Sequence, residues 1–279
     1  MSNYFLSKDK QITVTAALAE GNSIRSIERM TGIHRDTIMR LGVRIGQGCA
    51  RVLDQKMRGL SSTRIQLDEI WGFVGKKDKH VQWYEDSDRV GSVWTFCAID
   101  ADSKIVPCFK VGKRDSYTAN AFLADLASRV NNRLHISTDA LAAYYDAVEQ
   151  AFGADCDYGQ IVKSFTTEHG KYTPERKYSP PEVVAVSKYP VSGDPFMPHV
   201  TTSHVERLNA TTRLHMKRLN RLTLAFSKKI ENFEAAVALH FCAYNFVRPH
   251  RTLKMTPAIM AGIEKDFWSW GDLFEAANG

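Results

Sequence analysis

The sequence predicts an α/β protein in which a helical N-terminal part precedes a mixed sheet and further helices follow it. Residues 10–58 carry apolar side chains at helical spacing, interrupted by glycines. Residues 64–111 contain three β-rich runs, and residues 116–152 alternate between helical and extended patterns. At 279 residues the chain is long enough to bury a large core without disulfides.

Composition and cysteine usage exclude several classes of protein. The content of 44% hydrophobic and 24% charged residues is typical of globular proteins, and not of disordered or collagen-like chains. No apolar run approaches the length of about 18 residues that a membrane span needs, and the first residues do not have a signal-peptide layout. The five cysteines are scattered and form no C-x-x-C pair. We therefore expect a cytoplasmic protein with free thiols and no membrane partner.

The charge distribution indicates a polyanionic partner. Residues 1–63 carry a net charge of +5 and residues 201–279 a net charge of +4, whereas residues 64–200 carry −3. Basic ends favour binding to nucleic acid. An acidic middle in such a protein is typical of carboxylates that hold metal ions.

The N-terminal residues predict a helix-turn-helix. A first helix should end at Gly21, a second should begin after Asn22 or Ser23, and Gly32 should break the second from a third. A short third helix should run from His34 to Leu41, and a continuing helix to about Leu60 would link it to the next domain. The outward residues of the third helix are polar or basic, which favours DNA binding over a plain helical bundle. These are His34, Arg35, Thr37 and Arg40.

Three strands should come next. Residues 64–74 form one, and residues 93–99 and 104–111 form a hairpin around Ala101–Lys104. A loop centred there would pair Phe96 with Phe109, Trp94 with Val111, and Cys97 with Cys108. We therefore expect two adjacent thiols in this hairpin.

The remaining elements alternate. A helix is predicted over 116–130, a short strand over 134–138, and a helix over 141–152. Residues 155–200 are rich in Pro, Tyr and Lys and predict an extended insertion with a short strand or two. A long helix should run from Thr202 or Ser203 to about Leu219, and another from Ser227 to Phe246. Three antiparallel strands followed by this alternation are the layout of a ribonuclease-H-like core.

Two aspartates stand at positions that suit a metal site. Asp68 lies inside an apolar strand, where an unpaired carboxylate is costly and implies a charge partner or a metal. Asp139 follows the strand at 134–138, and its alternative role is to cap the next helix. Glu69 should point to the opposite face from Asp68, so we interpret it as structural or as a residue that supports the metal ligands.

Glu206 is a third candidate. It is the only acid among seven bases between Thr201 and Lys229, and it lies in the first turn of a predicted helix. Arg213 and Lys217 follow it at i+7 and i+11, with Asn209 between. This stripe suits a metal ligand beside a phosphate track that Arg218 and Arg221 extend, although a capping glutamate on a solvated face fits the same pattern.

The motifs together resemble those of a bacterial insertion-sequence DDE transposase of the insertion-sequence-1 type. The matching segments are Leu67-Asp68-Glu69-Ile70-Trp71, Ser137-Thr138-Asp139, Thr202-Ser203-His204-Val205-Glu206-Arg207-Leu208-Asn209, Ala225-Phe226-Ser227-Lys228-Lys229, Tyr244-Asn245-Phe246-Val247-Arg248-Pro249-His250 and Thr256-Pro257-Ala258.

The resemblance covers about residues 64–262 and implies a ribonuclease-H-like core with Asp68, Asp139 and Glu206 as its metal-binding triad. It also places Arg213 at the basic position two turns after the glutamate. Phosphodiester chemistry of this kind uses Mg²⁺ or Mn²⁺, with two ions expected.

The sequence therefore predicts a transposase that binds the terminal inverted repeats of its element, cuts them and joins them to target DNA. We expect a helix-turn-helix domain with a linker helix over 1–63, a catalytic domain over 64–226 and a helical extension over 227–279, acting as a homo-oligomer on DNA. Asn209, Asn245, Arg248 and His250 are expected to support the site. The alternatives are a ribonuclease-H-like nuclease or resolvase, and a DNA-binding regulator without catalytic activity.

Overall fold

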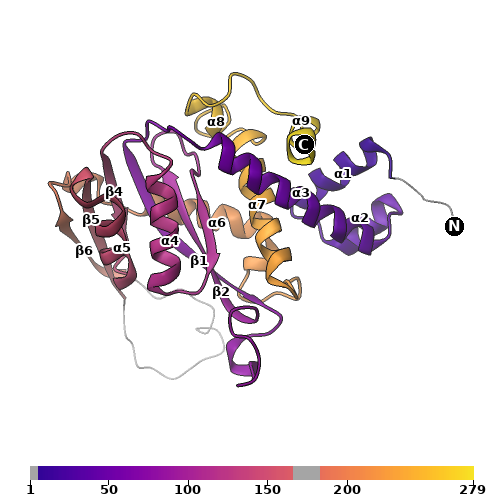
Figure 1. The fold of residues 1–279 in the computed structure, drawn as a ribbon, viewed down its shortest axis with the longest axis horizontal. Coiled ribbons are helices and arrows are strands. Elements are labelled where there is room, and N and C mark those ends of the chain that lie inside the picture. Colours follow the sequence, from indigo (N-terminus) through magenta and orange to yellow (C-terminus); the bar gives the residue numbers. More distant parts are fainter. Residues whose placement is uncertain (1–5, 166–182) are drawn as a thin grey trace.

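The computed structural model describes residues 6–165 and 183–279 and shows an α/β fold built on a six-stranded mixed sheet (Figure 1). The strand order is β3-β2-β1-β4-β5-β6. β1, β2 and β3 are antiparallel, β4 and β5 run parallel to β1, and β6 is antiparallel to β5. The strands are β1 (Arg64–Val74), β2 (Gly91–Asp100), β3 (Phe109–Gly112), β4 (Leu134–Thr138), β5 (Cys156–Phe165) and β6 (Val183–Ser192).

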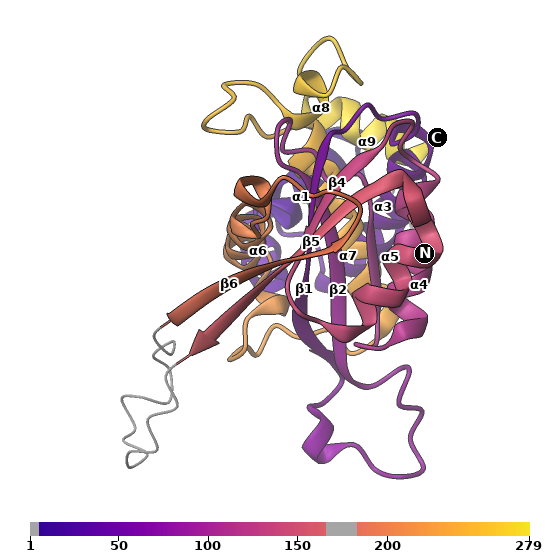
Figure 2. The same cartoon turned by 90° about the vertical axis from the view of Figure 1, so that its left-hand side faces the viewer.

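Helices cover both faces of the sheet (Figure 2). On one face, α4 (Ser116–Ala127) and α5 (Ala142–Phe152) bury Phe96, Phe122 and Tyr144. On the other, α6 (Ser203–His215) and α7 (Ile230–Phe246) pack over Ile70 and Cys97. The sheet is thus the middle of three layers, and side chains of β1 reach both cores.

The three N-terminal helices are α1 (Lys8–Ala19), α2 (Ile24–Thr31) and α3 (Arg35–Lys56). Of these, α3 packs most extensively on α7, and α1 and α2 pack against α3. Ser23 caps α2 by accepting from Ser26 N–H, and Gly32 ends it at φ 69°, as the sequence predicted.

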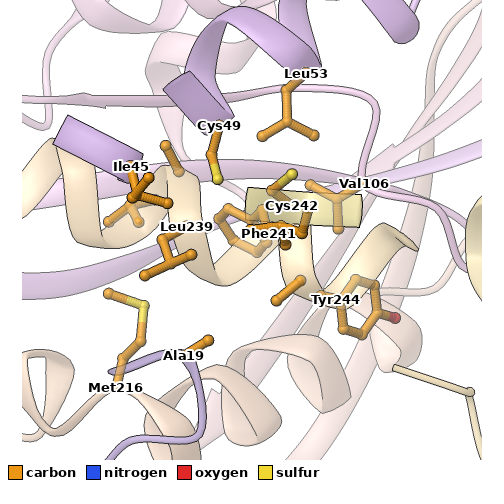
Figure 3. Packing of buried hydrophobic residues seen from close by; sticks show 14 of the residues in the cluster. Ala19, Ile45, Cys49, Leu53, Val106, Met216, Leu239, Phe241, Cys242 and Tyr244 are labelled. Atoms are coloured by element: carbon orange, nitrogen blue, oxygen red, sulfur yellow. The ribbon is translucent and has the colours of Figure 1, made fainter. Parts of the chain in front are cut away.

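Two glycines let α3 approach its neighbours at backbone distance. A Cβ on Gly46 would stand 2.1 Å from the carbonyl oxygen of Ala235 in α7, and one on Gly48 would stand 1.7 Å from that of Ala277. Ala277 belongs to α9 (Trp270–Asn278), which follows the short α8 (Pro257–Met260). Figure 3 shows the resulting interface, in which Cys49 and Leu53 of α3 face Phe241 and Cys242 of α7.

The predicted hairpin register is wrong by one residue. The loop is centred as expected, because Asp100 N–H donates to Ile105 C=O at 2.9 Å. Further along, however, Cys97 pairs with Phe109, Phe96 with Lys110, and Trp94 with Gly112.

The reason lies at Val106 and Pro107. Pro107 has no N–H to donate to a ladder, and both backbone groups of Val106 bind the Asn245 side chain, at 3.0 and 2.9 Å. One extra residue therefore enters the second strand. Cys97 and Cys108 consequently lie in the cores on opposite faces of the sheet, and the expected thiol neighbours are not formed. All five cysteines are free and buried.

The prediction of an insertion over 155–200 is also corrected. β5 pairs in parallel with the whole of β4, so its first half is part of the central sheet. Buried Tyr158 and Ile161 anchor it there. β5 and β6 together form a hairpin that extends beyond the helical layers (Figure 2). The middle of the predicted insertion, residues 166–182, lies outside the described residues.

Two helix boundaries differ from the prediction. α6 ends at His215, and a 3₁₀ turn over Lys217–Leu219 follows it. α7 begins at Ile230 instead of Ser227, since Ser227 forms a β-bridge with Val74 at the end of β1. Within residues 6–165 and 183–279, no helix combines the length and the apolar character needed to cross a bilayer.

Candidate metal centre

Three carboxylates meet where β1 extends beyond β4. β4 pairs with β1 only over Arg64–Gln66 and ends at Thr138, whereas β1 continues to Val74. Asp139 follows β4 directly and so lies beside the unpaired edge of β1. One oxygen each of Asp68, Glu69 and Asp139 lies within 4.8 Å of the others. The structure thus brings together the two aspartates that the sequence singled out.

Asp68 is held on the α6 side of the sheet. Asn209 Nδ2 donates to its Oδ2 at 2.7 Å. Burial and, after it, the charges of Glu69, Asp139 and Glu206 together raise the pKa of Asp68 to about 7. A bound cation would reverse this effect, because it favours the ionised carboxylate. Asn209 Oδ1 is buried and has no hydrogen-bond partner among the described residues.

Asp139 has a second, local role. Its Oδ1 accepts from Leu141 N–H at 3.0 Å and so shapes the turn before α5. The residue at the N-cap position of α5 is Leu141, not Asp139. The capping alternative is therefore met only in part, and one carboxylate oxygen remains for the cluster.

Glu69 makes the structural contacts that the sequence predicted, but its carboxylate also lies in the cluster. It does face α4 and α5, where Tyr144 Oη donates to its Oε2 at 3.1 Å and Arg114 Nε donates to its Oε1 at 2.6 Å. Its carboxylate nevertheless joins the cluster, because a glutamate is long enough to reach around a strand edge that carries no neighbour. Burial and the charge of Asp139 raise the pKa of Glu69. The signal in the sequence was its position next to Asp68.

Glu206 lies near the cluster but outside it. Its carboxylate forms an ion pair with Lys163 of β5 and accepts from Thr202 Oγ1 at 2.6 Å. The start of α6 is bound to β1 through Gln66, whose Oε1 accepts from His204 N–H at 2.8 Å. The helix that carries Glu206 is therefore bound to β1 at Gln66, two residues before Asp68 in the same strand. The charge of Glu206 contributes to the raised pKa of Asp68.

The basic residues after Glu206 divide into two groups: Arg213 lies within α6, and Lys217, Arg218 and Arg221 lie beyond its end. Arg213 lies one turn beyond Asn209, with its side chain partly buried. Burial and the charge of Arg221 lower the pKa of Arg213, while the nearby charge of Asp68 raises it. The Arg213 Nε is buried without a partner among the described residues. Arg213 therefore lies on the Asp68 side of the cluster.

The predicted stripe beyond Arg213 is wrong. The helix ends before Lys217, so the spacing i+11 places no residue on the same face. Lys217 and Arg221 are exposed. Arg218 turns inward, and its guanidinium donates to Ser227 Oγ and to Asn232 C=O, so it holds the segment between α6 and α7.

The predicted DNA-binding residues of the N-terminal part lie at the start of α3. His34, Arg35, Thr37 and Arg40 are all exposed. His34 also has a local role, because its Nδ1 accepts from Asp36 N–H at 3.3 Å and caps α3. Arg35 receives support through its backbone N–H, which donates to Glu28 Oε1 at 2.9 Å.

The expected supporting residues act at a distance from the carboxylates. Asn245 binds Val106, as described above. Arg248 donates to Ala19 C=O and, at 3.2 Å, to Glu20 Oε1, and so joins α7 to the end of α1. Burial and the charges of Lys104 and Arg207 lower the pKa of His250. Asn209 is the one member of this set that contacts a cluster carboxylate.

A scan of the chain against protein-family models finds no match, and a search of curated protein sequences finds no significant match. The arguments for function therefore rest on the site itself. Its donors are all carboxylate oxygens, which suit hard divalent cations such as Mg²⁺ and Mn²⁺ better than softer metals.

Proposed function

We propose that this chain is a DNA transposase that binds the terminal inverted repeats of an insertion sequence and catalyses metal-dependent cleavage and strand transfer. The observation that carries the proposal is the carboxylate cluster at the unpaired edge of β1, with Asp68 and Asp139 on neighbouring parallel strands. The order of the strands and the motif resemblance support a ribonuclease-H-like core over residues 64–226.

Asp68 and Asp139 would hold the divalent cations, with Glu206 as a further ligand after exchange from Lys163. Bound Mg²⁺ or Mn²⁺, with two ions expected, supplies Lewis-acid activation of the attacking hydroxyl and stabilises the leaving oxygen. Asn209 orients Asp68 through its 2.7 Å hydrogen bond. Arg213 lies where it would neutralise a phosphate beside Asp68.

The N-terminal residues would supply recognition of the inverted repeats. Gly32 ends α2 in the left-handed conformation and α3 begins three residues later, which supports a helix-turn-helix over residues 24–41. Arg35 and Arg40 would lie nearest the DNA. Two ends must be joined in one reaction, so a homo-oligomer on DNA is part of the proposal. The helices after residue 227 would be an extension packed on this core.

A joining assay tests the proposal. A labelled duplex from the DNA on each side of the coding sequence is incubated with plasmid and protein in Mg²⁺, in Mn²⁺ or in EDTA. We expect the labelled 3′ strand to become covalently joined to plasmid only with metal. Cleavage without joining would favour the nuclease or resolvase. Binding with neither reaction in either metal would favour the regulator, and no binding to either flank would contradict all three.

A further inference from the structure

Arg114 lies beside the carboxylate cluster, on the side of the sheet opposite Arg213. It occupies the short connection between β3 and α4. The next residue, Asp115, caps α4 by accepting from Thr118 N–H at 2.9 Å, which fixes the backbone at this point. Sequence patterns gave no reason to select Arg114, because it belongs to none of the motifs.

The guanidinium of Arg114 is anchored by two different groups. Its Nε donates to Glu69 Oε1 at 2.6 Å, and its Nη2 lies 2.6 Å from the same oxygen. Its plane lies over the Trp94 indole, with the guanidinium carbon 5.0 Å from the ring centroid. A long, mobile side chain is thus held in one orientation before any ligand binds, which lowers the entropic cost of recognition.

This anchoring leaves one end of the guanidinium available. The Arg114 side chain is 40% exposed, whereas that of Glu69 is 2% exposed. Within residues 6–165 and 183–279, the hydrogen bonds of Arg114 use Nε and Nη2 and not Nη1. The Nη1 group of Arg114 is therefore left to bind a ligand at the rim of the cluster. The planar N–H donors of a guanidinium suit phosphate oxygens.

We propose, on the basis of the transposase function proposed above, that Arg114 binds a phosphate of the DNA strand next to the phosphate that is cleaved. A DNA strand lying across the cluster would then meet an arginine side chain on each side. Arg213 would contact it from the α6 side and Arg114 from the α4 side. Glu69 holds Arg114 at the edge of the metal centre and keeps it out of the centre.

The alternative role for Arg114 is only to neutralise buried Glu69. A direct substitution of Arg114 does not separate the two roles, since it leaves a buried carboxylate without its partner and destabilises the fold. Two variants on a common background avoid this problem. Glu69→Gln removes the buried charge, and the double variant Glu69→Gln with Arg114→Gln then removes the cation alone.

The test is the salt dependence of DNA binding, measured in EDTA with the duplex from the flank of the coding sequence. Each phosphate contact to duplex DNA contributes about 0.9 to the slope of log binding constant against log salt concentration. We expect the slope to be smaller by about 0.9 in the double variant than in Glu69→Gln. Equal slopes would contradict the proposal.

A matched ion pair at the opposite end of β4 provides the control. Arg133 lies just before β4 and pairs with Asp157. We expect Asp157→Asn, alone and combined with Arg133→Gln, to give equal slopes. If removing Arg133 lowered the salt slope by the same amount as removing Arg114, the change would be a general effect of charge, and the proposed role of Arg114 would be overturned. A wild-type protein that binds neither flank would instead contradict the transposase proposal, and this inference with it.

Discussion

The two halves of the candidate site are held in different ways. Asp68 and Asp139 are placed by backbone pairing, because β1 and β4 are adjacent parallel strands. Glu206 is placed by a docked helix, and its carboxylate is engaged with Lys163 and Thr202. The strand-held half is therefore already assembled, whereas the helix-held half needs an exchange of partners before Glu206 reaches a cation.

The largest effect should come from the strand-held half. Asp139→Asn should lower metal-dependent joining by more than about 100-fold, the size expected when a group that stabilises developing charge is removed. DNA binding should remain, because the exposed basic residues of α3 are unchanged. Asp146→Asn, an exposed aspartate on α5, is the matched control and should leave joining intact. Joining retained in Asp139→Asn would show that the cluster is not the reaction centre.

Asp68, in the strand-held half, should also lower the free energy of unfolding of the metal-free protein at high pH. Burial and, after it, the neighbouring carboxylate charges raise the pKa of Asp68 from 3.8 to about 7. Between these values the folded protein binds more protons than the unfolded chain, so the free energy of unfolding falls as the pH rises. Asp68→Asn removes this loss and should be more stable than wild type at pH 8, by about 1–4 kcal/mol.

The difference between the two proteins should shrink at pH 4, where Asp68 is protonated in the folded state. Urea unfolding in EDTA at both pH values measures it. A wild-type stability that rises between pH 5 and pH 8 relative to Asp68→Asn would contradict the raised pKa.

The smallest effect should come from the helix-held half. Lys163→Met removes the partner of Glu206, and partly exposed ion pairs of this kind contribute at most about 1 kcal/mol. The affinity for Mn²⁺ should therefore increase by about two- to fivefold, while Glu206→Gln should decrease it. Titration calorimetry without DNA measures both. If neither variant changes Mn²⁺ affinity, Glu206 does not reach the metal.

Much of this arrangement follows from local sequence patterns. An aspartate inside an apolar strand and an aspartate directly after another strand indicated the cluster, because a carboxylate in an apolar strand needs a charge partner or a metal. The start of α2 at Ser23 and its end at Gly32 were equally local, since capping and left-handed backbone depend on single residues.

The errors arose where a distant partner decided the outcome. The hairpin register depends on Asn245, which lies 139 residues from Val106 and takes both of its backbone groups. Arg218 turns inward because Ser227 and Asn232 accept from it. Glu69 joins the cluster because β4 is shorter than β1. The relative lengths of two paired strands cannot be predicted from the pattern of either strand alone. Arg114 was not selected from the sequence because its place at the site depends on its contact with Glu69, 45 residues away.

Iron-mediated cleavage of the protein backbone would locate the metal centre along the chain. Fe²⁺ replaces Mg²⁺, and ascorbate with peroxide generates radicals that cut the chain close to the bound ion. A metal centre at the unpaired edge of β1 predicts cuts near residues 68 and 139, with a further cut near residue 206 where Glu206 reaches the ion, and these cuts should disappear with excess Mg²⁺ and in Asp139→Asn. Cuts elsewhere along the chain, or cuts at these positions that persist in Asp139→Asn, would contradict a metal centre at the unpaired edge of β1.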